Sequence, residues 1–347
     1  MTSLKIVVLG CGANGASISA DLVRAGLDVV LIEQWPEHIE AMRVSGLRIE
    51  MPDETLEVPV RVFNLCEVCT LNDQFDIVLL LMKAYDTRWA CQLIEPYLKN
   101  NGLVVAVQNG MTTDTVADIV GTERTMGSVI EISAALFEPG TVERHTPPSN
   151  SWFAVGAVDP RAMDQAGQIA ELLEHSGTVE ITGDIQAAKW MKLVSNCSTL
   201  ALPAILGLPT IEALRHPGMR ELMLLAGQEA LDAGAASGYP IKPIFGLTVE
   251  DMRQPERVVG VLLDKICASY ALPHTTSTVL QDWRKGRRSE VGQINGIVVR
   301  ECARQGRSAP INAGIVNIAR AIERHELRPT PDNLPMLTQL ADAVSEK

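Results

Sequence analysis

Two patterns of hydrophobic positions divide the chain. In the first half, short runs of β-branched and aliphatic residues alternate with stretches in which apolar residues recur every three or four positions. This alternation is typical of strands and helices that build a parallel sheet covered on both faces. Strands are predicted at residues 5–9, 28–32, 77–82, 103–107 and 179–182, and helices at 36–45, 89–98, from 113 and at 159–175.

Two segments of the first half follow a different pattern. Residues 56–62 alternate between apolar and polar side chains and are expected to pair antiparallel with residues 47–51, across Pro52-Asp53-Glu54, as an addition to one sheet edge. Residues 128–158 resemble short strands interrupted by Pro139-Gly140 and Pro147-Pro148. Both segments interrupt the alternation of strands and helices.

The second half carries helical patterns, so the chain is predicted to form two domains. Residues 1–183 are expected to form an α/β domain with a doubly wound sheet, and residues 184–347 a helical domain. A length of 347 residues suits two domains. The helices of the second domain are predicted at 185–206, 219–236, 256–269, 288–305 and 313–325.

Composition and charge narrow the class of protein. Hydrophobic residues make up 46% of the chain and charged residues 21%, which is typical of a globular protein. The net charge of −12 argues against binding to nucleic acid or to an anionic membrane surface. Because no apolar run of about 18 residues and no cleavable secretory pattern occurs, we expect a cytoplasmic location.

The cysteines do not predict a disulfide framework. Seven cysteines are scattered without regular spacing, and we interpret them as small buried hydrophobic residues. Cys66 and Cys69 form a CxxC pair that would suit a redox-active dithiol or half a zinc site. No second pair or nearby Cys/His set completes a metal site, so no metal is expected.

A glycine-rich turn follows the first strand and opens a helix. Its sequence is Gly10-Cys11-Gly12-Ala13-Asn14-Gly15, which has the GxGxxG spacing of dinucleotide-binding turns. Gly10 permits the tight turn, Gly12 lets the backbone approach a pyrophosphate, and Gly15 lets the helix pack closely on the strand. The positive end of the helix dipole then faces the phosphates. These residues are therefore predicted to bind a nicotinamide dinucleotide.

Glu33 ends the second strand, about 20 positions after the first glycine, where an acid can accept a hydrogen bond from the ribose 2′-hydroxyl of NAD. The same charge would repel the 2′-phosphate of NADP, and no arginine follows in Gln34-Trp35-Pro36. We therefore favour NAD(H) over NADP(H). The alternative is that Glu33 is a solvated charge at the end of a strand.

Five blocks of polar and glycine residues span nearly the whole chain. They are GCGANG at 10–15, MKAYDT at 82–87, QNG at 108–110, KWxKxxxN at 189–196, and STxxQD at 277–282 followed by Glu290 and ING at 294–296. Together and in this order, the blocks resemble the ketopantoate reductase (2-dehydropantoate 2-reductase) family. We therefore expect residues 1–183 to be an NAD(P)-binding Rossmann domain and residues 184–347 a helical substrate and catalytic domain.

The resemblance implies a helical second domain similar to the C-terminal domain of 6-phosphogluconate dehydrogenase, and it assigns roles to side chains. Lys83 would contact the adenosine side of the cofactor and Asn109 the nicotinamide ribose. Lys192 would be the general acid, with Lys189 beside it, since a lysine partly removed from water can exchange a proton near neutral pH. Glu290 would be a second catalytic residue, with a contact in the active-site cleft. Asn196 and Thr278 would line the substrate site, where the Thr278 hydroxyl would meet the substrate carboxylate.

Two departures from the family pattern concern the substrate. Leu200 and Thr275 stand where the family often has asparagine, so fewer polar groups would face a hydroxylated acid. The predicted function is hydride transfer between a nicotinamide cofactor and the carbonyl or hydroxyl of a small 2-oxo or 2-hydroxy acid such as 2-dehydropantoate. The alternatives are an NAD-dependent catabolic dehydrogenase of another hydroxy acid, or an NAD(P)-sensing protein without turnover. A homodimer is an assembly that the sequence leaves open.

Overall fold

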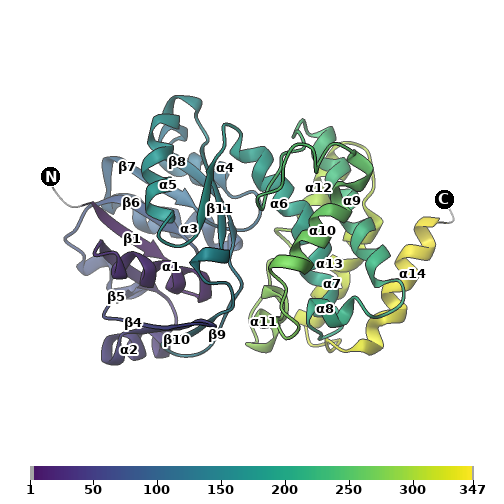
Figure 1. Ribbon diagram of the computed structural model, residues 1–347, viewed down its shortest axis with the longest axis horizontal. Helices are drawn as coiled ribbons and strands as arrows, with labels where there is room; N and C mark the ends of the chain where they lie inside the picture. The colour runs from purple at the N-terminus through teal and green to yellow at the C-terminus, as the bar shows by residue number, and fades with distance from the viewer. Residues whose placement is uncertain (1–3, 346–347) are drawn as a thin grey trace. The chain divides into compact units, whose positions relative to one another are not determined.

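The computed structural model describes residues 4–345 (Figure 1). The chain divides into two compact units, Met1–Lys189 and Trp190–Lys347. The first unit holds every described strand, and all regular elements described in the second unit are helices. This confirms the prediction of a Rossmann-type α/β part followed by a helical part.

The main sheet of the first unit has eight strands in the order β12-β11-β8-β7-β6-β1-β2-β5. Neighbouring strands are parallel except for β11 and β8, which pair antiparallel. The strands are β1 (Lys5–Leu9), β2 (Asp28–Glu33), β5 (Arg61–Asn64), β6 (Phe75–Leu80), β7 (Leu98–Ala106), β8 (Thr125–Glu131), β11 (Trp152–Ala157) and β12 (Thr178–Ile181).

Both faces of the central part of this sheet are buried, which explains why inner strands such as β1 and β6 are almost continuously apolar. Within β1, Ile6 and Val8 point into one hydrophobic cluster, while Val7 and Leu9 point into another. The first cluster includes residues of α1, α2 and α5, and the second includes residues of α3 and α4. The helices are α1 (Ala13–Arg24), α2 (Pro36–Ser45), α3 (Thr87–Ile94), α4 (Thr113–Val120) and α5 (Ala166–Leu173).

A second sheet of four strands packs on α1, in the order β4-β3-β10-β9. The predicted hairpin is present as β3 (Leu47–Glu50) and β4 (Thr55–Val58), joined by β9 (Ala134–Glu138) and β10 (Thr141–Arg144). The prediction that residues 56–62 are one strand at the edge of the main sheet is wrong. Pro59 has no N–H to donate, so the strand ends at Val58, and the following residues enter the main sheet as β5.

A buried ion pair connects α1 to the second sheet. Arg144 of β10 donates to Asp21 of α1 at 2.5 Å, and both side chains are fully buried. The same guanidinium donates to the carbonyls of Thr146 and Ser176 and to the Ser151 hydroxyl. Arg24 of α1 donates to the other oxygen of Asp21 at 3.2 Å. Because both charges have these partners, they can remain buried.

The second unit is built around α7, α9 and α13. The prediction of one helix over 185–206 is wrong, because the helix breaks at Leu200. Pro203 has no N–H to donate to the carbonyl of Thr199 four residues earlier, and its ring would clash with that carbonyl in a continuous helix. The helices are α6 (Ile185–Thr199), α7 (Ala201–Ile205), α8 (Thr210–Ala213), α9 (Met219–Ala236), α10 (Val258–Ser269), α11 (Thr278–Arg284), α12 (Asn295–Arg304), α13 (Pro310–Glu323) and α14 (Leu334–Ser345).

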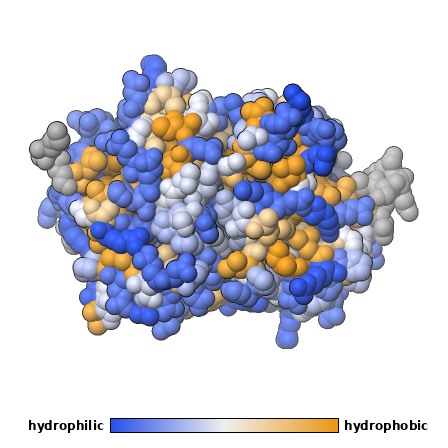
Figure 2. Space-filling view, viewed as in Figure 1, coloured by the Kyte–Doolittle hydropathy of each residue, from blue (hydrophilic) through white to orange (hydrophobic). Residues whose placement is uncertain are grey.

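Figure 2 shows one face of the protein, on which hydrophobic residues form separate patches among polar ones. Among residues 4–345, no helix combines the length and the apolar character that a membrane span requires.

Candidate active site

The glycine-rich turn lies between β1 and α1 and is shaped by close packing. A Cβ at Gly10, where φ is +98°, would come within 2.6 Å of the Met82 backbone nitrogen, and one at Gly15 would come within 2.0 Å of the Gly10 carbonyl oxygen. Any side chain at either position would therefore displace the turn. At Gly12, by contrast, a Cβ would meet nothing within 4 Å.

These features fit a dinucleotide pyrophosphate. A side chain at position 12 would fill the open space in front of the turn, and glycine leaves that space to a ligand. No side chain caps the N-terminus of α1, and its first turn contains no acidic residue. The backbone N–H groups of that turn can therefore bind a phosphate, which the helix dipole also favours.

Glu33 and His38 hold the same turn from one side. The Glu33 carboxylate is buried and accepts hydrogen bonds from the backbone N–H of Cys11 at 2.6 Å and of Trp35 at 3.0 Å. The His38 ring is fully buried: its Nδ1 accepts from the N–H of Gly140, and its Nε2 lies 3.1 Å from the carbonyl oxygen of Cys11. A carboxylate has about four acceptor positions, so Glu33 retains acceptors for a ribose hydroxyl.

Lys83 and Asn109 both follow the carboxyl ends of neighbouring parallel strands, β6 and β7, and both are partly exposed. The Gln108 side chain links the two strand ends that precede Asn109 and Lys83. Its amide NH₂ donates to the Met82 carbonyl at 2.6 Å, and its amide oxygen accepts from the Thr87 hydroxyl at 3.2 Å. The edge of the sheet that carries Lys83 and Asn109 is therefore rigid.

Lys189 has a structural contact within the first unit. Its ammonium is buried and donates to the Gln108 carbonyl at 2.7 Å and to the Ser128 carbonyl at 3.4 Å. Two backbone acceptors, one just after β7 and one in the middle of β8, fix this charge. Lys189 thus supports the loop that carries Asn109.

Lys192 lies one turn further along α6, in the second unit, and is only 8% exposed. Its Nζ is 4.9 Å from the centroid of the Phe245 ring, within the range of a cation–π interaction. Phe245 is 1% exposed and also packs against Tyr270 at 5.7 Å between ring centroids. The Lys192 ammonium is therefore held against an aromatic face in a site largely closed to water.

The backbone of Phe245 has a φ of +62°, which is unfavourable for a bulky side chain. Such a conformation costs about 1–3 kcal/mol and persists only where the surroundings enforce it, most often at functional sites. The segment between α9 and α10 that carries it contains Pro240, Pro243 and Gly246, and it is irregular up to a short 3₁₀ helix, η7 (Pro255–Arg257). Nothing at position 245 itself indicated this role in the sequence.

Glu290 is buried, but the prediction that it lies in the first turn of a helix is wrong. The helix α12 begins only at Asn295, and residue 290 lies in a bend before it. Ser289 explains the difference, because its N–H and its hydroxyl both donate to Glu323 of α13 at 2.9 and 2.6 Å. This tertiary contact holds the segment out of the helix.

The remaining predicted substrate residues lie around the break between α6 and α7. Asn196 is buried on α6, while Leu200 is partly buried and packs against the hydrophobic core of the unit. The Leu200 carbonyl accepts a hydrogen bond from the Ser277 hydroxyl at 2.8 Å, and Ser277 also caps α11. Thr278 is the first residue of α11. The hydroxyl of Thr275 is buried and makes no hydrogen bond to any described residue.

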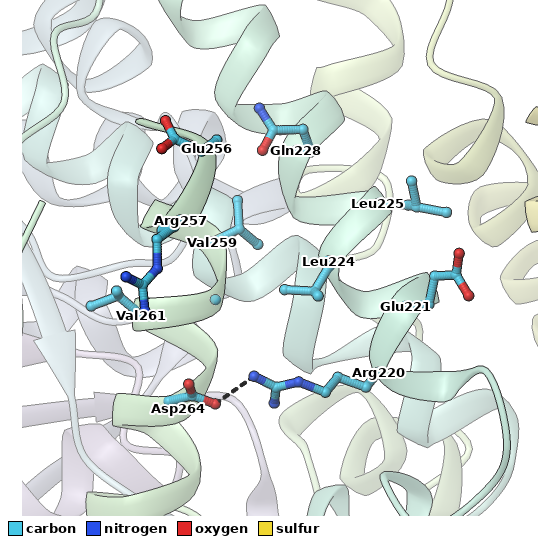
Figure 3. A pocket seen from close by; sticks show the side chains of 11 residues that line it. Arg220, Glu221, Leu224, Leu225, Gln228, Glu256, Arg257, Val259, Val261 and Asp264 are labelled. Carbon is cyan, nitrogen blue, oxygen red and sulfur yellow. Dashed lines mark hydrogen bonds and ion pairs between the residues drawn. The ribbon is translucent and has the colours of Figure 1, made fainter. Parts of the chain in front are cut away.

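A cavity of about 430 Å³ lies elsewhere in the second unit, between α9 and the start of α10 (Figure 3). Its apolar floor is flanked by an ion pair between Arg220 and Asp264 at 2.7 Å. None of the predicted site residues lines it, so it does not belong to the candidate active site. Its lining comprises Arg220, Glu221, Leu224, Leu225, Gln228, Glu256, Arg257, Val259, Gly260, Val261 and Asp264.

The interpretation of all cysteines as buried side chains is wrong for the CxxC pair. Cys66 and Cys69 are exposed, whereas Cys11, Cys91, Cys197 and Cys302 are buried and Cys267 is intermediate. Among residues 4–345, no group of three or more His, Cys, Asp or Glu side chains is arranged to hold a metal ion.

Two family models match this chain. Residues 6–159 match the model described as ketopantoate reductase PanE/ApbA, and residues 184–323 match the model described as its C-terminal part. The chain belongs to the ketopantoate reductase family. It is accordingly an oxidoreductase that uses a nicotinamide cofactor, as the sequence predicted.

Relatives of this ketopantoate reductase family member align along nearly their whole length. A protein of Archaeoglobus fulgidus named 2-dehydropantoate 2-reductase is 26% identical over 325 residues, covering 92% of this chain and 98% of the relative. One of the same name from Caulobacter vibrioides is 28% identical over 337 residues, covering 92% and 99%.

Solved structures agree with the fold. A PanE/ApbA family ketopantoate reductase from Ralstonia eutropha has a TM-score of 0.77 and 26% identity, covering 93% of this chain and 99% of that one. A ternary structure of D-mandelate dehydrogenase with NADH and anilino(oxo)acetate has a TM-score of 0.82 with 20% identity and the same coverage.

Proposed function

We propose that the protein transfers a hydride between NAD(H) and the carbonyl carbon of a 2-oxo acid, with Lys192 as the proton donor to the substrate oxygen. Gly10, Gly12, Ala13, Asn14 and Gly15 form the turn that would hold the cofactor pyrophosphate. When bound, the nicotinamide supplies or accepts the hydride.

The observation that carries the proposal is the buried Lys192 ammonium. A charged lysine is seldom removed from water unless it is needed, and here an aromatic face fixes its position. In the reductive direction, Lys192 donates a proton to the oxygen that gains negative charge as its carbon is reduced. In the oxidative direction, the same nitrogen takes the proton from the substrate hydroxyl.

For the substrate, we propose 2-dehydropantoate or a related 2-oxo acid with a less polar tail. Curated relatives are named 2-dehydropantoate 2-reductase, which supports the first. Leu200 supports a 2-oxo acid with a less polar tail, because an apolar side chain beside the substrate tail would leave a hydroxyl group of 2-dehydropantoate without a hydrogen-bond partner. The buried, unpartnered Thr275 hydroxyl supports a polar contact nearby. We also propose that Asn196, Thr278 and Glu290 contact the substrate.

For the cofactor, we propose that NAD(H) binds better than NADP(H), with Lys83 and Asn109 as further contacts. The buried Glu33 carboxylate is fixed by two backbone N–H groups at the turn, where a negative charge would repel a 2′-phosphate. A cytoplasmic location and a homodimer stay predictions.

The proton-transfer step is tested with Lys192→Met, which keeps an unbranched side chain without the charge. We expect kcat to fall by roughly 10²- to 10⁴-fold with little change in NADH affinity. Lys189→Met is the matched control, because Lys189 supports the Asn109 loop and its loss should weaken cofactor binding and stability. A silent Lys192→Met beside a large kcat loss in Lys189→Met would show that the proton donor is Lys189.

Cofactor choice is tested by measuring the Kd of NADH and NADPH for Glu33→Gln and for the exposed control Glu37→Gln. We expect Glu33→Gln to shift the ratio of the two Kd values toward NADPH, while Glu37→Gln leaves it unchanged. A wild type that strongly prefers NADPH would disprove the assignment of Glu33.

Substrate choice is tested by kcat/KM over a panel of 2-oxo acids, in wild type and Leu200→Asn. We expect Leu200→Asn to shift the ratio of kcat/KM values toward 2-dehydropantoate. A wild type that prefers 2-dehydropantoate by tenfold or more, about 1.4 kcal/mol, would contradict the role of Leu200. Cofactor binding without turnover across the whole panel would favour a sensing protein instead.

A further inference from the structure

We propose that Cys66 and Cys69 are a redox-active dithiol that closes into a reversible intramolecular disulfide. The two residues belong to a short 3₁₀ helix, η1 (Leu65–Thr70), which follows β5 in the first unit. They are the two cysteines that are exposed among the seven, and the proposed function uses neither of them.

The helix geometry brings the two side chains to one side. In a 3₁₀ helix, residues three apart lie directly above one another, so their Cα atoms are separated by about 6 Å along the axis. A disulfide needs a Cα separation of roughly 4.4–6.8 Å, so the spacing is suitable. The Cys69 sulfur already lies 3.5 Å from the carbonyl oxygen of Cys66.

Both thiols must leave their present hydrogen bonds for the bond to form. The Cys66 sulfur donates to the Asn64 amide oxygen at 3.1 Å, and that oxygen also accepts from the Cys66 N–H. Rotation about χ1 of an exposed cysteine crosses a low barrier between staggered positions. A capping box between Asn64 and Glu67 holds the start of the helix. Its second turn must tighten as the bond closes, because the Cβ atoms of a disulfide lie about 3.5–4.5 Å apart.

The reaction requires an oxidant, which we take to be a low-molecular-weight disulfide. One cysteine thiolate attacks a sulfur of that disulfide, which forms a mixed disulfide and releases one thiolate. The second cysteine thiolate then displaces the other thiol and closes the protein disulfide. The two cysteines together lose two protons and two electrons, and the small disulfide is reduced to two thiols.

The other cysteines cannot easily compete. Burial raises the pKa of Cys91 to about 12 and raises the pKa of Cys11 and of Cys197 well above the ordinary value. Those thiols therefore form little thiolate, and small oxidants do not reach them. Cys267 is partly exposed, but it has no neighbouring cysteine in sequence with which to form a disulfide.

The test is incubation of the native, full-length protein with glutathione disulfide, followed by intact mass measurement and peptide mapping. We expect the wild type to lose two hydrogen masses through a Cys66–Cys69 bond that dithiothreitol reverses. Cys66→Ser and Cys69→Ser should each instead keep one glutathione adduct on the remaining cysteine. Cys267→Ser is the matched control and should form the same bond as the wild type.

Two results would overturn the proposal. One is a wild type that keeps stable glutathione adducts on both Cys66 and Cys69 without closing the bond. The other is oxidation that links two protein chains through these cysteines. Because the measurement is of mass alone, neither result depends on Lys192 or on the substrate.

Discussion

Replacement of Phe245 by leucine should weaken the hold on Lys192 without opening a large cavity. Leucine keeps an apolar side chain at the unfavourable φ of +62°, so the backbone strain is the same in both proteins. What is lost is the aromatic face, 4.9 Å from the ammonium. The comparison therefore isolates the contact between the ring and the charge.

The magnitude follows from the burial of the lysine. A cation–π contact contributes about 0.5–1 kcal/mol where it is exposed and about 2 kcal/mol where water is excluded. Lys192 is 8% exposed, so the value should lie near the upper end. We expect a coupling free energy of about 1–2 kcal/mol between the two side chains, and a fall in kcat of roughly tenfold as the ammonium loses its fixed position.

The assay is a double-mutant cycle with Phe245→Leu, Lys192→Met and the double variant, measured by urea denaturation and by kcat. Phe245→Leu changes the packing equally in both backgrounds, so the free energy of that change cancels in the cycle. In the Lys192→Met background, Phe245→Leu should have no further effect on kcat. A coupling free energy below about 0.5 kcal/mol, or an equal loss of kcat in both backgrounds, would refute the role of the ring. Phe245→Tyr retains an aromatic face and should restore most of the activity.

Three further predictions concern the first unit. His38→Leu should lower the free energy of unfolding by about 2–6 kcal/mol and raise the Kd of NADH, because the Cys11 carbonyl and the Gly140 N–H lose their partner; an unchanged urea midpoint would exclude this. Arg144→Met should destabilise the unit by about 3–5 kcal/mol, since it removes the buried partner of Asp21 and leaves that carboxylate with the partly exposed Arg24, and Asp21→Leu in addition should recover much of the loss in urea denaturation. Oxidation of Cys66 and Cys69 should raise the Kd of NADH. Asn64 loses the hydrogen bond from the Cys66 thiol, and Asn64 lies opposite Glu33 in the register of β5 and β2, so the change should reach the cofactor contact of Glu33. Equal affinities of the reduced and oxidised protein in calorimetry would rule this out.

The sequence predicts the sheet and the glycine-rich turn well because both depend on local signals. The bounds of β1, α2 and α9 agree with prediction at both ends. Apolar runs buried on two faces and a turn that only glycine can form leave few alternatives. The break at Leu200 could also be predicted from the sequence, because Pro203 alone is sufficient to end the preceding helix.

Other features depend on contacts between distant residues. The second sheet pairs Thr141 with Arg48, and no local pattern near either residue indicates that partner. The bend at Glu290 depends on Glu323, and the position of Lys192 depends on Phe245. Propensity and periodicity describe neighbours along the chain, so they cannot locate such partners.

The ion pair between Asp21 and Arg144 has a consequence for the order of events during synthesis. Asp21 emerges from the ribosome 123 residues before its partner, and the Ser176 carbonyl that completes the arginine's contacts emerges later still. Until then, the dinucleotide-binding helix would dock with a buried Asp21 carboxylate that lacks its buried partner and pairs with the partly exposed Arg24 of the same helix. A nascent chain arrested before residue 144 should therefore remain sensitive to protease, and one extended well beyond residue 176 should become resistant.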